Sequence, residues 1–336
     1  MARGPSADPQ NRPGETPADD ELGPYRVRLA RALAATDLAD GAAVLDGLDR
    51  AGLGDGLPVV PPSADRMHAM LAGRNPEALT GGGPLPIAFA KPTWGDVATA
   101  AVLAGCRAGA LPLIAAALDA VADPAFNLLG VQTTTGAAAP LLIVHGAAVT
   151  RFGCHAGAGS MGAGHRANLT IGRAVRLVLA DVGICRPGEA DMATHGHPGK
   201  VSWLVAENQA ASPWPSLSAR RGRDHDGAGV TVFAGVGSVE VVLPTTGPDA
   251  VAARLAEVLR GLCAPDAVLV LPPESASFLT RHDWDLATLD ADLQALGVGP
   301  PMVVVSGGTG IKATVVPGWG GPTAAVTRWI EEETPT

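Results

Sequence analysis

The sequence predicts an α/β fold in which helices pack on mixed sheets, and it allows a division into two α/β subdomains. Three observations lead to this class. Short apolar segments with strand character alternate with helical segments over most of the 336 residues. Hydrophobic residues make up 47% of the chain and charged residues only 17%, which supplies ample apolar material for buried cores. The 43 glycines and 29 prolines indicate many tight turns.

The chain is expected to have three parts. Residues 1–23 are polar with scattered Pro and Gly, which is typical of a disordered tail. Residues 24–247 are expected to form the main α/β domain, which contains a glycine-rich candidate site. From Pro248 helices and strands alternate more regularly, so residues 248–336 are expected to form a smaller α/β subdomain.

Capping signals and apolar periodicity predict the first helices. Ser63 is placed to cap a short helix, and Thr93 and Asp96 stand in capping-box spacing. Residues Asp55–Pro62 (DGLPVVPP) are expected to form a short strand, because the closing prolines forbid a helix. The expected helices are Tyr25–Ala35, Ala42–Ala51, Ser63–Leu71, Thr93–Gly105 and Leu111–Val121.

Strand patterns dominate the middle of the chain and return near its end. Residues Arg186–Lys200 lack periodicity and are expected to form a loop, and Val230–Gly235 and Val239–Pro244 read as a strand pair. The other expected strands are Leu141–Val144, Val201–Asn208, Ala267–Leu271, Met302–Ser306 and Ile311–Val316. The other expected helices are Val251–Cys263, Ser275–His282 and Leu286–Leu296.

Charge, hydropathy and cysteine spacing exclude several classes of protein. A net charge of −9 argues against a nucleic-acid partner, which normally requires a basic face. No apolar run reaches the roughly 18 residues that a membrane helix needs, and the N-terminus lacks the apolar region of a signal peptide, so a cytoplasmic protein is expected. The four cysteines form no C-x-x-C pair, which argues against a disulfide scaffold or a zinc ribbon.

The glycine-rich stretch from Val144 to Arg176 is the strongest candidate for a binding site. Five glycines, including Gly162 and Gly164, lead into a helix expected to begin near His165. A helix N-terminus exposes backbone N–H groups and the positive end of the helix dipole, and Arg166 adds a positive charge, so a carboxylate or phosphate site is expected there. The alternative is that the glycines permit close packing and the arginines face water. The spacing fits neither a dinucleotide fingerprint nor a Walker loop, so no nucleotide cofactor is expected.

Further polar residues are expected to bind a small anionic substrate. Asn168 and Thr170 lie in the first turns of that helix, and Lys200 and Asn208 lie in loops that flank an expected strand. The predicted substrate-binding residues are therefore Arg166, Gly162, Gly164, Asn168, Thr170, Lys200 and Asn208.

Five of the eight histidines lie between Val144 and Pro198, and four of them are candidate metal ligands. His195-Gly-His197 offers two imidazoles from one extended segment, and His155 or His165 could complete a site for zinc, copper or nickel. The alternative is that these are ordinary loop histidines. The fifth, His145, ends an expected strand and reads as a hydrogen-bonded core histidine.

The predicted catalytic residues are His155, His165, Cys154 and Glu189. A cysteine near a helix N-terminus and cationic side chains would have a lowered pKa and act as a nucleophile, although an isolated Cys is more often buried packing. The histidines would transfer protons, and Glu189, together with Asp191, is a candidate base or a partner of a metal ligand.

Several motifs together resemble a largely uncharacterised bacterial family whose members accompany small UGSC-motif proteins, which carry selenocysteine or cysteine before Gly-Ser-Cys. These motifs are DGLPVVPP, FNLLGVQTTT, GAGSMGAGHRANLTIGRAVRL, RPGEADMATHGHPGK, AENQAASPW and the closing GGTG with PGWGG. They cover most of the chain from Asp55 to Gly321. The resemblance implies one enzyme-like cleft but no particular reaction.

The four candidate histidines depart from the family pattern. In that pattern small polar residues or Trp stand at the positions of His155 and His165, and Leu and Gln stand at those of His195 and His197. The resemblance therefore implies that these histidines belong to a specialised mechanism rather than to a shared one.

Together these features predict an enzyme that acts on a small anionic metabolite. A lyase or hydrolase, metal-assisted through the histidine cluster as one option, is favoured over an oxidoreductase because no nicotinamide or flavin fingerprint is present. The alternative is a non-catalytic subunit that binds a metabolite and pairs with a small redox (seleno)cysteine protein. A homo-oligomer is a further option that the sequence leaves open.

Overall fold

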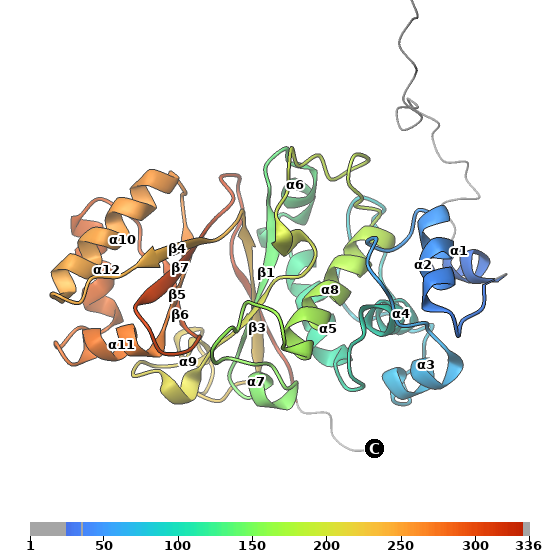
Figure 1. The fold of residues 1–336 in the computed structure, drawn as a ribbon, viewed down its shortest axis with the longest axis horizontal. Coiled ribbons are helices and arrows are strands. Elements are labelled where there is room, and N and C mark those ends of the chain that lie inside the picture. The colour runs from blue at the N-terminus through green and yellow to red at the C-terminus, as the bar shows by residue number, and fades with distance from the viewer. Residues whose placement is uncertain (1–24, 35, 332–336) are drawn as a thin grey trace, which may run out of the picture.

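Two four-stranded mixed sheets, with helices on their outer faces, form the centre of the molecule (Figure 1). The computed structural model describes residues 25–34 and 36–331. The predicted α/β class is confirmed. The predicted tail, residues 1–23, lies outside the described residues.

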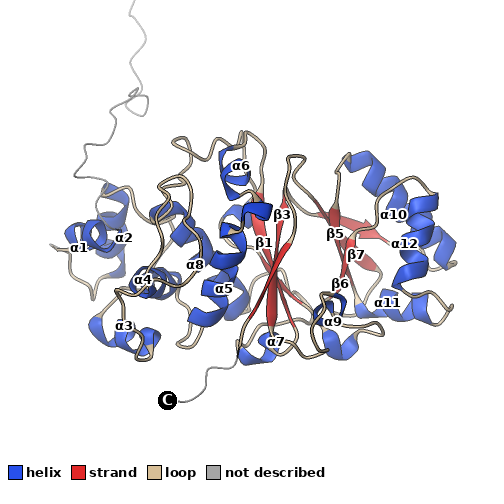
Figure 2. Ribbon diagram, turned by 180° about the vertical axis from the view of Figure 1, so that it is seen from behind, coloured by secondary structure: helices blue, strands red, loops and turns tan. Residues whose placement is uncertain are grey.

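The helices alternate with the strands through most of the described chain, as Figure 2 shows by colour. The α-helices are α1 (Tyr25–Leu33), α2 (Gly41–Arg50), α3 (Ala64–Leu71), α4 (Trp94–Ala104), α5 (Leu111–Ala122), α6 (Leu128–Thr133), α7 (Ala148–Arg151), α8 (Arg166–Asp181), α9 (Leu217–Arg220), α10 (Pro248–Leu262), α11 (Pro273–Thr280) and α12 (Leu286–Ala295). The strands are β1 (Ala139–His145), β2 (Leu204–Ala206), β3 (Gly229–Gly235), β4 (Val239–Val242), β5 (Ala267–Leu271), β6 (Met302–Val305), β7 (Lys312–Pro317) and β8 (Val326–Trp329).

The first sheet has the strand order β2-β1-β3-β8. Strand β1 pairs parallel with β2 and antiparallel with β3, and β3 pairs antiparallel with β8. Every residue of β1 and β3 is buried, because helices cover one face and the second sheet covers the other. Because both faces of β1 and β3 are buried, their sequences are predominantly apolar and do not alternate between apolar and polar residues.

The second sheet has the order β4-β7-β5-β6 and faces the first. Strand β5 pairs parallel with β6 and antiparallel with β7, and β4 lies at the edge next to β7. Helices α10, α11 and α12 cover its outer side (Figures 1 and 2).

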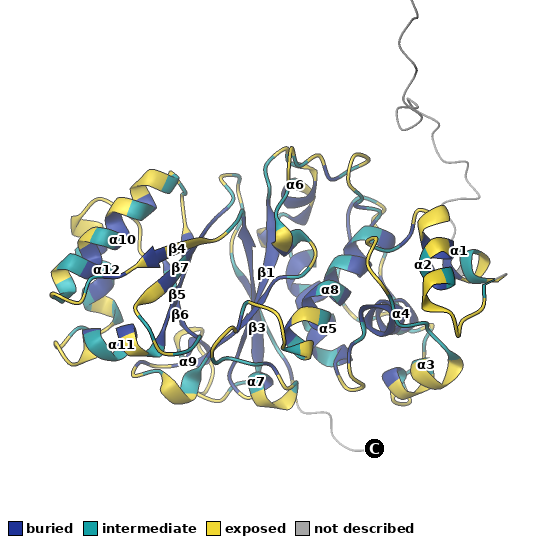
Figure 3. Ribbon diagram, viewed as in Figure 1, coloured by how far each residue is buried: buried dark blue, intermediate teal, exposed yellow. Residues whose placement is uncertain are grey.

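An apolar layer lies between the two sheets and makes them one core. Leu141, Trp203 and Phe233 from the first sheet side pack with Val268 and Val316 from the second. Figure 3 shows the strands of both sheets as predominantly buried. At one end of this layer a Cβ on Gly235 would lie 2.7 Å from side-chain atoms of both Trp203 and Val316, so only glycine fits there.

The division between the sheets does not coincide with the expected boundary at residue 247. Strand β4 precedes that position and belongs to the second sheet. Strand β8 follows it and returns to the first sheet, where it pairs with β3. The predicted pairing of the Val230–Gly235 and Val239–Pro244 segments is therefore wrong, because β3 and β4 lie in different sheets.

The predicted helix starts are borne out to different degrees. Thr93 and Asp96 form the complete capping box of α4, with the Thr93 Oγ1 accepting from Asp96 N at 3.2 Å and the Asp96 carboxylate accepting from Thr93 N at 2.9 Å. Ser63 precedes α3 but its side chain makes no capping hydrogen bond. Residues 55–62 form no strand; this segment runs as a loop along α4, where Val60 N donates to Leu103 O.

Among the described residues, no single helix is both long and apolar enough to cross a membrane. One pair of neighbouring helical segments, Leu111–Ala122 and Pro124–Thr133, reaches the required length together but is bent by 66°.

Candidate functional site

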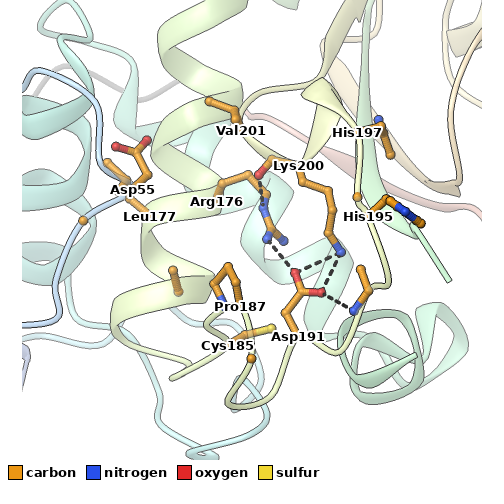
Figure 4. Close-up of a pocket in the computed structure, with 15 residues that line it drawn as sticks. Asp55, Arg176, Leu177, Cys185, Pro187, Asp191, His195, His197, Lys200 and Val201 are labelled. Atoms are coloured by element: carbon orange, nitrogen blue, oxygen red, sulfur yellow. Dashed lines mark hydrogen bonds and ion pairs between the residues drawn. The ribbon is translucent and has the colours of Figure 1, made fainter. Parts of the chain in front are cut away.

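A cavity of about 300 Å³ lies beside the second half of α8. The loop between Cys185 and Val201 forms most of its wall, and Gly54 and Asp55 close one side. We call this cavity the Asp191 pocket after the buried carboxylate at its centre (Figure 4). Its volume is at the lower end of the range for small-molecule sites.

Asp191 is the meeting point of the pocket's polar side chains. Its carboxylate is only 5% exposed and lies 2.9 Å from Lys200 Nζ and 3.8 Å from Arg176 Nη2. It also accepts a hydrogen bond from Ala193 N at 3.2 Å, which holds the loop around it. Lys200 Nζ donates in addition to Ala138 O at 3.2 Å. These donors hold the Asp191 carboxylate in place, and the carboxylate in turn holds Lys200.

Arg176 supplies the donors that remain available in the pocket. Its Nε donates to Lys200 O at 2.9 Å, which anchors the guanidinium to the pocket wall. Within the described residues its two Nη atoms make no hydrogen bond, because the ion pair with Asp191 is longer than hydrogen-bond distance. Burial is the main cause that lowers the pKa of Arg176, and guanidinium groups stay charged at neutral pH even so.

His195 and His197 line the pocket beyond Lys200, on the side away from Asp55 and Leu177 (Figure 4). His195 is exposed at the rim. His197 is half-buried, accepts a hydrogen bond from Gly199 N at 3.1 Å, and meets Trp203 edge-on with ring centroids 4.7 Å apart. Burial, and then the charge of Lys200, lower the pKa of His197, so this imidazole is neutral at pH 7.

The predicted anion cradle at the start of α8 does not form. Arg166 turns away from the glycine loop, donating its Nε to Gly105 O at 2.8 Å and its Nη2 to Cys106 O at 3.5 Å. It borders a separate cavity of about 190 Å³ that neither Gly162 nor Gly164 lines. The guanidinium therefore ties α8 to the end of α4, where the last carbonyls of a helix need donors.

Thr170 and Asn168 also have structural partners. Thr170 Oγ1 donates to Arg166 O one turn earlier in α8. Asn168 is buried, accepts from His155 N at 2.8 Å, and donates to the carbonyls of His155 and Ser160 at 2.8 Å each. Asn168 thus fixes the glycine-rich loop against α8 and does not face the Asp191 pocket.

The four predicted metal ligands fall into two pairs. His155 and His165 stack face to face, with ring centroids 3.5 Å apart and an interplanar angle of 11°. His195 and His197 line the Asp191 pocket, which His155 and His165 do not. In the part of the chain that the structure describes, no three His, Cys, Asp or Glu side chains form a group that could hold a metal ion. The predicted convergence of these histidines is therefore wrong: one pair lies before α8 and at its N-cap, and the other lies in the loop after α8.

Two predicted catalytic residues, Cys154 and Glu189, and the predicted substrate-binding residue Asn208 do not line the Asp191 pocket. Cys154 is buried, and burial raises the pKa of its thiol to about 12, so it is not the predicted thiolate. Glu189 is exposed and does not line the Asp191 pocket. Asn208 follows β2 and its backbone N donates to Val305 O at 2.7 Å, which links the two sheets.

Arg176 is the residue that the sequence failed to single out. It follows Arg166 and Arg173 on the same helix, but Arg173 is fully engaged by Asp55, at 2.6 Å and 2.7 Å, and by two loop carbonyls. The only signal was its position ten residues beyond Arg166, three turns further along and next to the Arg186–Lys200 loop. Of the predicted residues, Lys200, His195 and His197 do meet in one pocket.

No family model, no curated protein and no solved structure matches this chain. The resemblance to the family that accompanies UGSC-motif proteins therefore stays a prediction.

Proposed function

We propose that this chain is an enzyme of the lyase or hydrolase type and that the Asp191 pocket is where it acts on a small anionic metabolite. The observation that carries the proposal is the convergence of Arg176 and Lys200 on one buried carboxylate at the wall of a cavity. Two cations and one anion leave an excess positive charge in a site of low polarity, which favours an anionic ligand.

The proposed roles follow from the positions of the side chains. Arg176 binds the anion through its two Nη groups, as guanidinium does with carboxylates. Lys200, held by Asp191, adds electrostatic stabilisation for negative charge that develops during the reaction. His195, exposed at the rim, gives or accepts a proton, which is the commonest role of histidine in catalysis.

Activity of the chain without partners tests the proposal. The purified protein is incubated with a defined mixture of small carboxylic acids and their esters and amides, and proton NMR follows their conversion. The His195→Gln variant should lose about 100-fold or more in kcat with little change in KM, and Arg176→Gln should chiefly raise KM. Arg254→Gln, which changes an arginine on α10 whose side chain is 41% exposed, is the control.

Two outcomes would count against this function. Binding without any turnover, or turnover only after a small (seleno)cysteine protein is added, would favour the alternative of a metabolite-binding subunit. Elemental analysis of the same preparation tests the predicted zinc, copper or nickel, and a metal content that survives loss of both His195 and His197 would place the metal elsewhere.

A further inference from the structure

We infer that the ligand of the Asp191 pocket is a short aliphatic monocarboxylate, a molecule with one negative charge and an unbranched or small apolar body. The inference rests on the proposed function and specifies its substrate class. Three features of the pocket carry it: the number of its charges, the donors of Arg176, and the chemistry of its remaining walls.

The charge count favours a single negative charge on the ligand. Arg176 and Lys200 face one carboxylate, Asp191, so one positive charge remains without a counter-charge. The other acidic residue of the lining, Asp55, is already neutralised by the two-pronged bond from Arg173. A dianion would leave one negative charge uncompensated in a partly enclosed site, which costs free energy, whereas a monoanion is matched.

The donor geometry favours a carboxylate as that charge. The hydrogen bond from Nε to Lys200 O holds Arg176 in place, and Nη2 has only the longer 3.8 Å ion pair with Asp191, so the two Nη groups keep donors for two carboxylate oxygens. Because the guanidinium is fixed to Lys200 O, little side-chain freedom is lost when an anion binds.

The remaining walls favour an aliphatic body. Leu177, Ala180, Pro187, Ala193 and Val201 supply the apolar surface around the charged centre. Among the described lining residues there is no Phe, Tyr or Trp; the imidazoles of His195 and His197 border the pocket beyond Lys200, and the apolar part of the wall is aliphatic. Each methylene group buried here should tighten binding by about fourfold.

Calorimetric titration of the full chain tests the inference with butanoate, acetate, succinate and inorganic phosphate. Butanoate should bind more tightly than acetate by about 15-fold, since two more methylenes are buried. At pH 8, where phosphate is chiefly a dianion, succinate and phosphate should bind at least about tenfold more weakly than butanoate, because each brings a second charge. Arg176→Gln should weaken butanoate binding at least about tenfold, and the Arg254→Gln control should not.

A variant with an added charge provides an independent test. Val201 lines the pocket and is 40% exposed, so Val201→Lys places a second uncompensated cation at the rim without disturbing the core. This variant should bind succinate more tightly than the wild type does and should narrow or reverse its preference for butanoate. An unchanged preference would contradict the charge argument.

The outcomes separate this inference from the proposed function. If succinate or phosphate binds the wild type as tightly as butanoate and Arg176→Gln abolishes that binding, the anion site stands and the monocarboxylate class is wrong. If none of the four anions binds, both the ligand class and the Asp191 pocket as an anion site are wrong.

Discussion

Asp181 is a deeply buried carboxyl group next to Gly54 of the pocket wall. It ends α8, is 1% exposed, and accepts hydrogen bonds from Gly54 N at 3.2 Å and 3.1 Å. Arg186 Nη2 lies 3.9 Å away, too far for a hydrogen bond. Burial is the main cause that raises the pKa of Asp181 to about 7, against an ordinary value near 4.

This raised pKa predicts a pH dependence of stability. Between about pH 4 and about pH 7 the unfolded chain has released the Asp181 proton while the folded chain retains it. The folded state then binds more protons, so raising the pH through this window lowers the free energy of unfolding. Asp181→Asn removes the titration and keeps an acceptor for Gly54 N. The variant should therefore gain stability relative to the wild type as the pH rises from 4.5 to 8.

Urea denaturation at several pH values measures the effect on Asp181. The difference in the free energy of unfolding between the variant and the wild type is the relevant quantity, because other carboxyl groups affect both proteins equally. A difference that stays constant from about pH 4 to about pH 8 would contradict the buried, protonated carboxyl group.

His145 shows how a residue that is prominent in the sequence can be purely structural. It is fully buried, its Nδ1 lies 2.8 Å from Ser218 Oγ, and its Nε2 lies 3.0 Å from Thr231 Oγ1. Burial lowers the pKa of His145 to about 3, so the ring is neutral. The interpretation of His145 as a hydrogen-bonded core histidine is confirmed.

At the scale of elements, the two predicted N-caps provide a matched pair of variants. Thr93→Ala removes the capping box of α4 and should lower the free energy of unfolding by about 1 kcal/mol. Ser63→Ala removes a hydroxyl that makes no capping bond to α3 and should change it by less than about 0.5 kcal/mol. Chemical denaturation measures both values. Equal losses in the two variants would mean that Ser63 caps α3 in solution.

Elements with strong periodicity could be predicted from the sequence, and α8 is the clearest case. Its expected apolar face, including Ile171, Ala174, Val175 and Val178, is buried as predicted. Strand β5 has the predicted bounds, Ala267–Leu271. These segments are specified locally, since one buried face or one continuous apolar run determines each of them.

Elements that depend on distant partners could not be predicted. Strand β8 contains Thr327 and Arg328, and it becomes a strand only because β3 offers an edge and Arg328 pairs with Asp119 and Asp123 of the α5 end. The pocket could not be predicted from the sequence for the same reason. Arg166 and Arg176 look alike in sequence, and only the folded positions of the flanking loops make one a tie between helices and the other a pocket residue.

On the scale of the whole molecule, the apolar layer between the sheets makes the two halves depend on each other. Trp203 and Phe233 are buried only because β5, β6 and β7 cover them. The chain passes between the sheets twice: it enters the second sheet at β4 and returns to the first sheet at β8.

A fragment of residues 24–247 should therefore fail to fold as a unit. It lacks β8, leaves β4 without its partner β7, and exposes the face of the first sheet that the second sheet covers. We expect no cooperative thermal unfolding and rapid proteolysis of the fragment, compared with the full chain. A cooperative transition with its own midpoint would show that the first sheet is stable alone.

The position of β8 near the end of the chain also determines when the first sheet can be completed during synthesis. Strand β3 emerges from the ribosome long before Val326–Trp329, the strand that completes its sheet. Many proteins fold one domain at a time from the N-terminus as translation proceeds. Here β3 stays unpaired on one side until residue 329 has left the ribosome, so during synthesis this apolar strand is an edge on which another chain can pair.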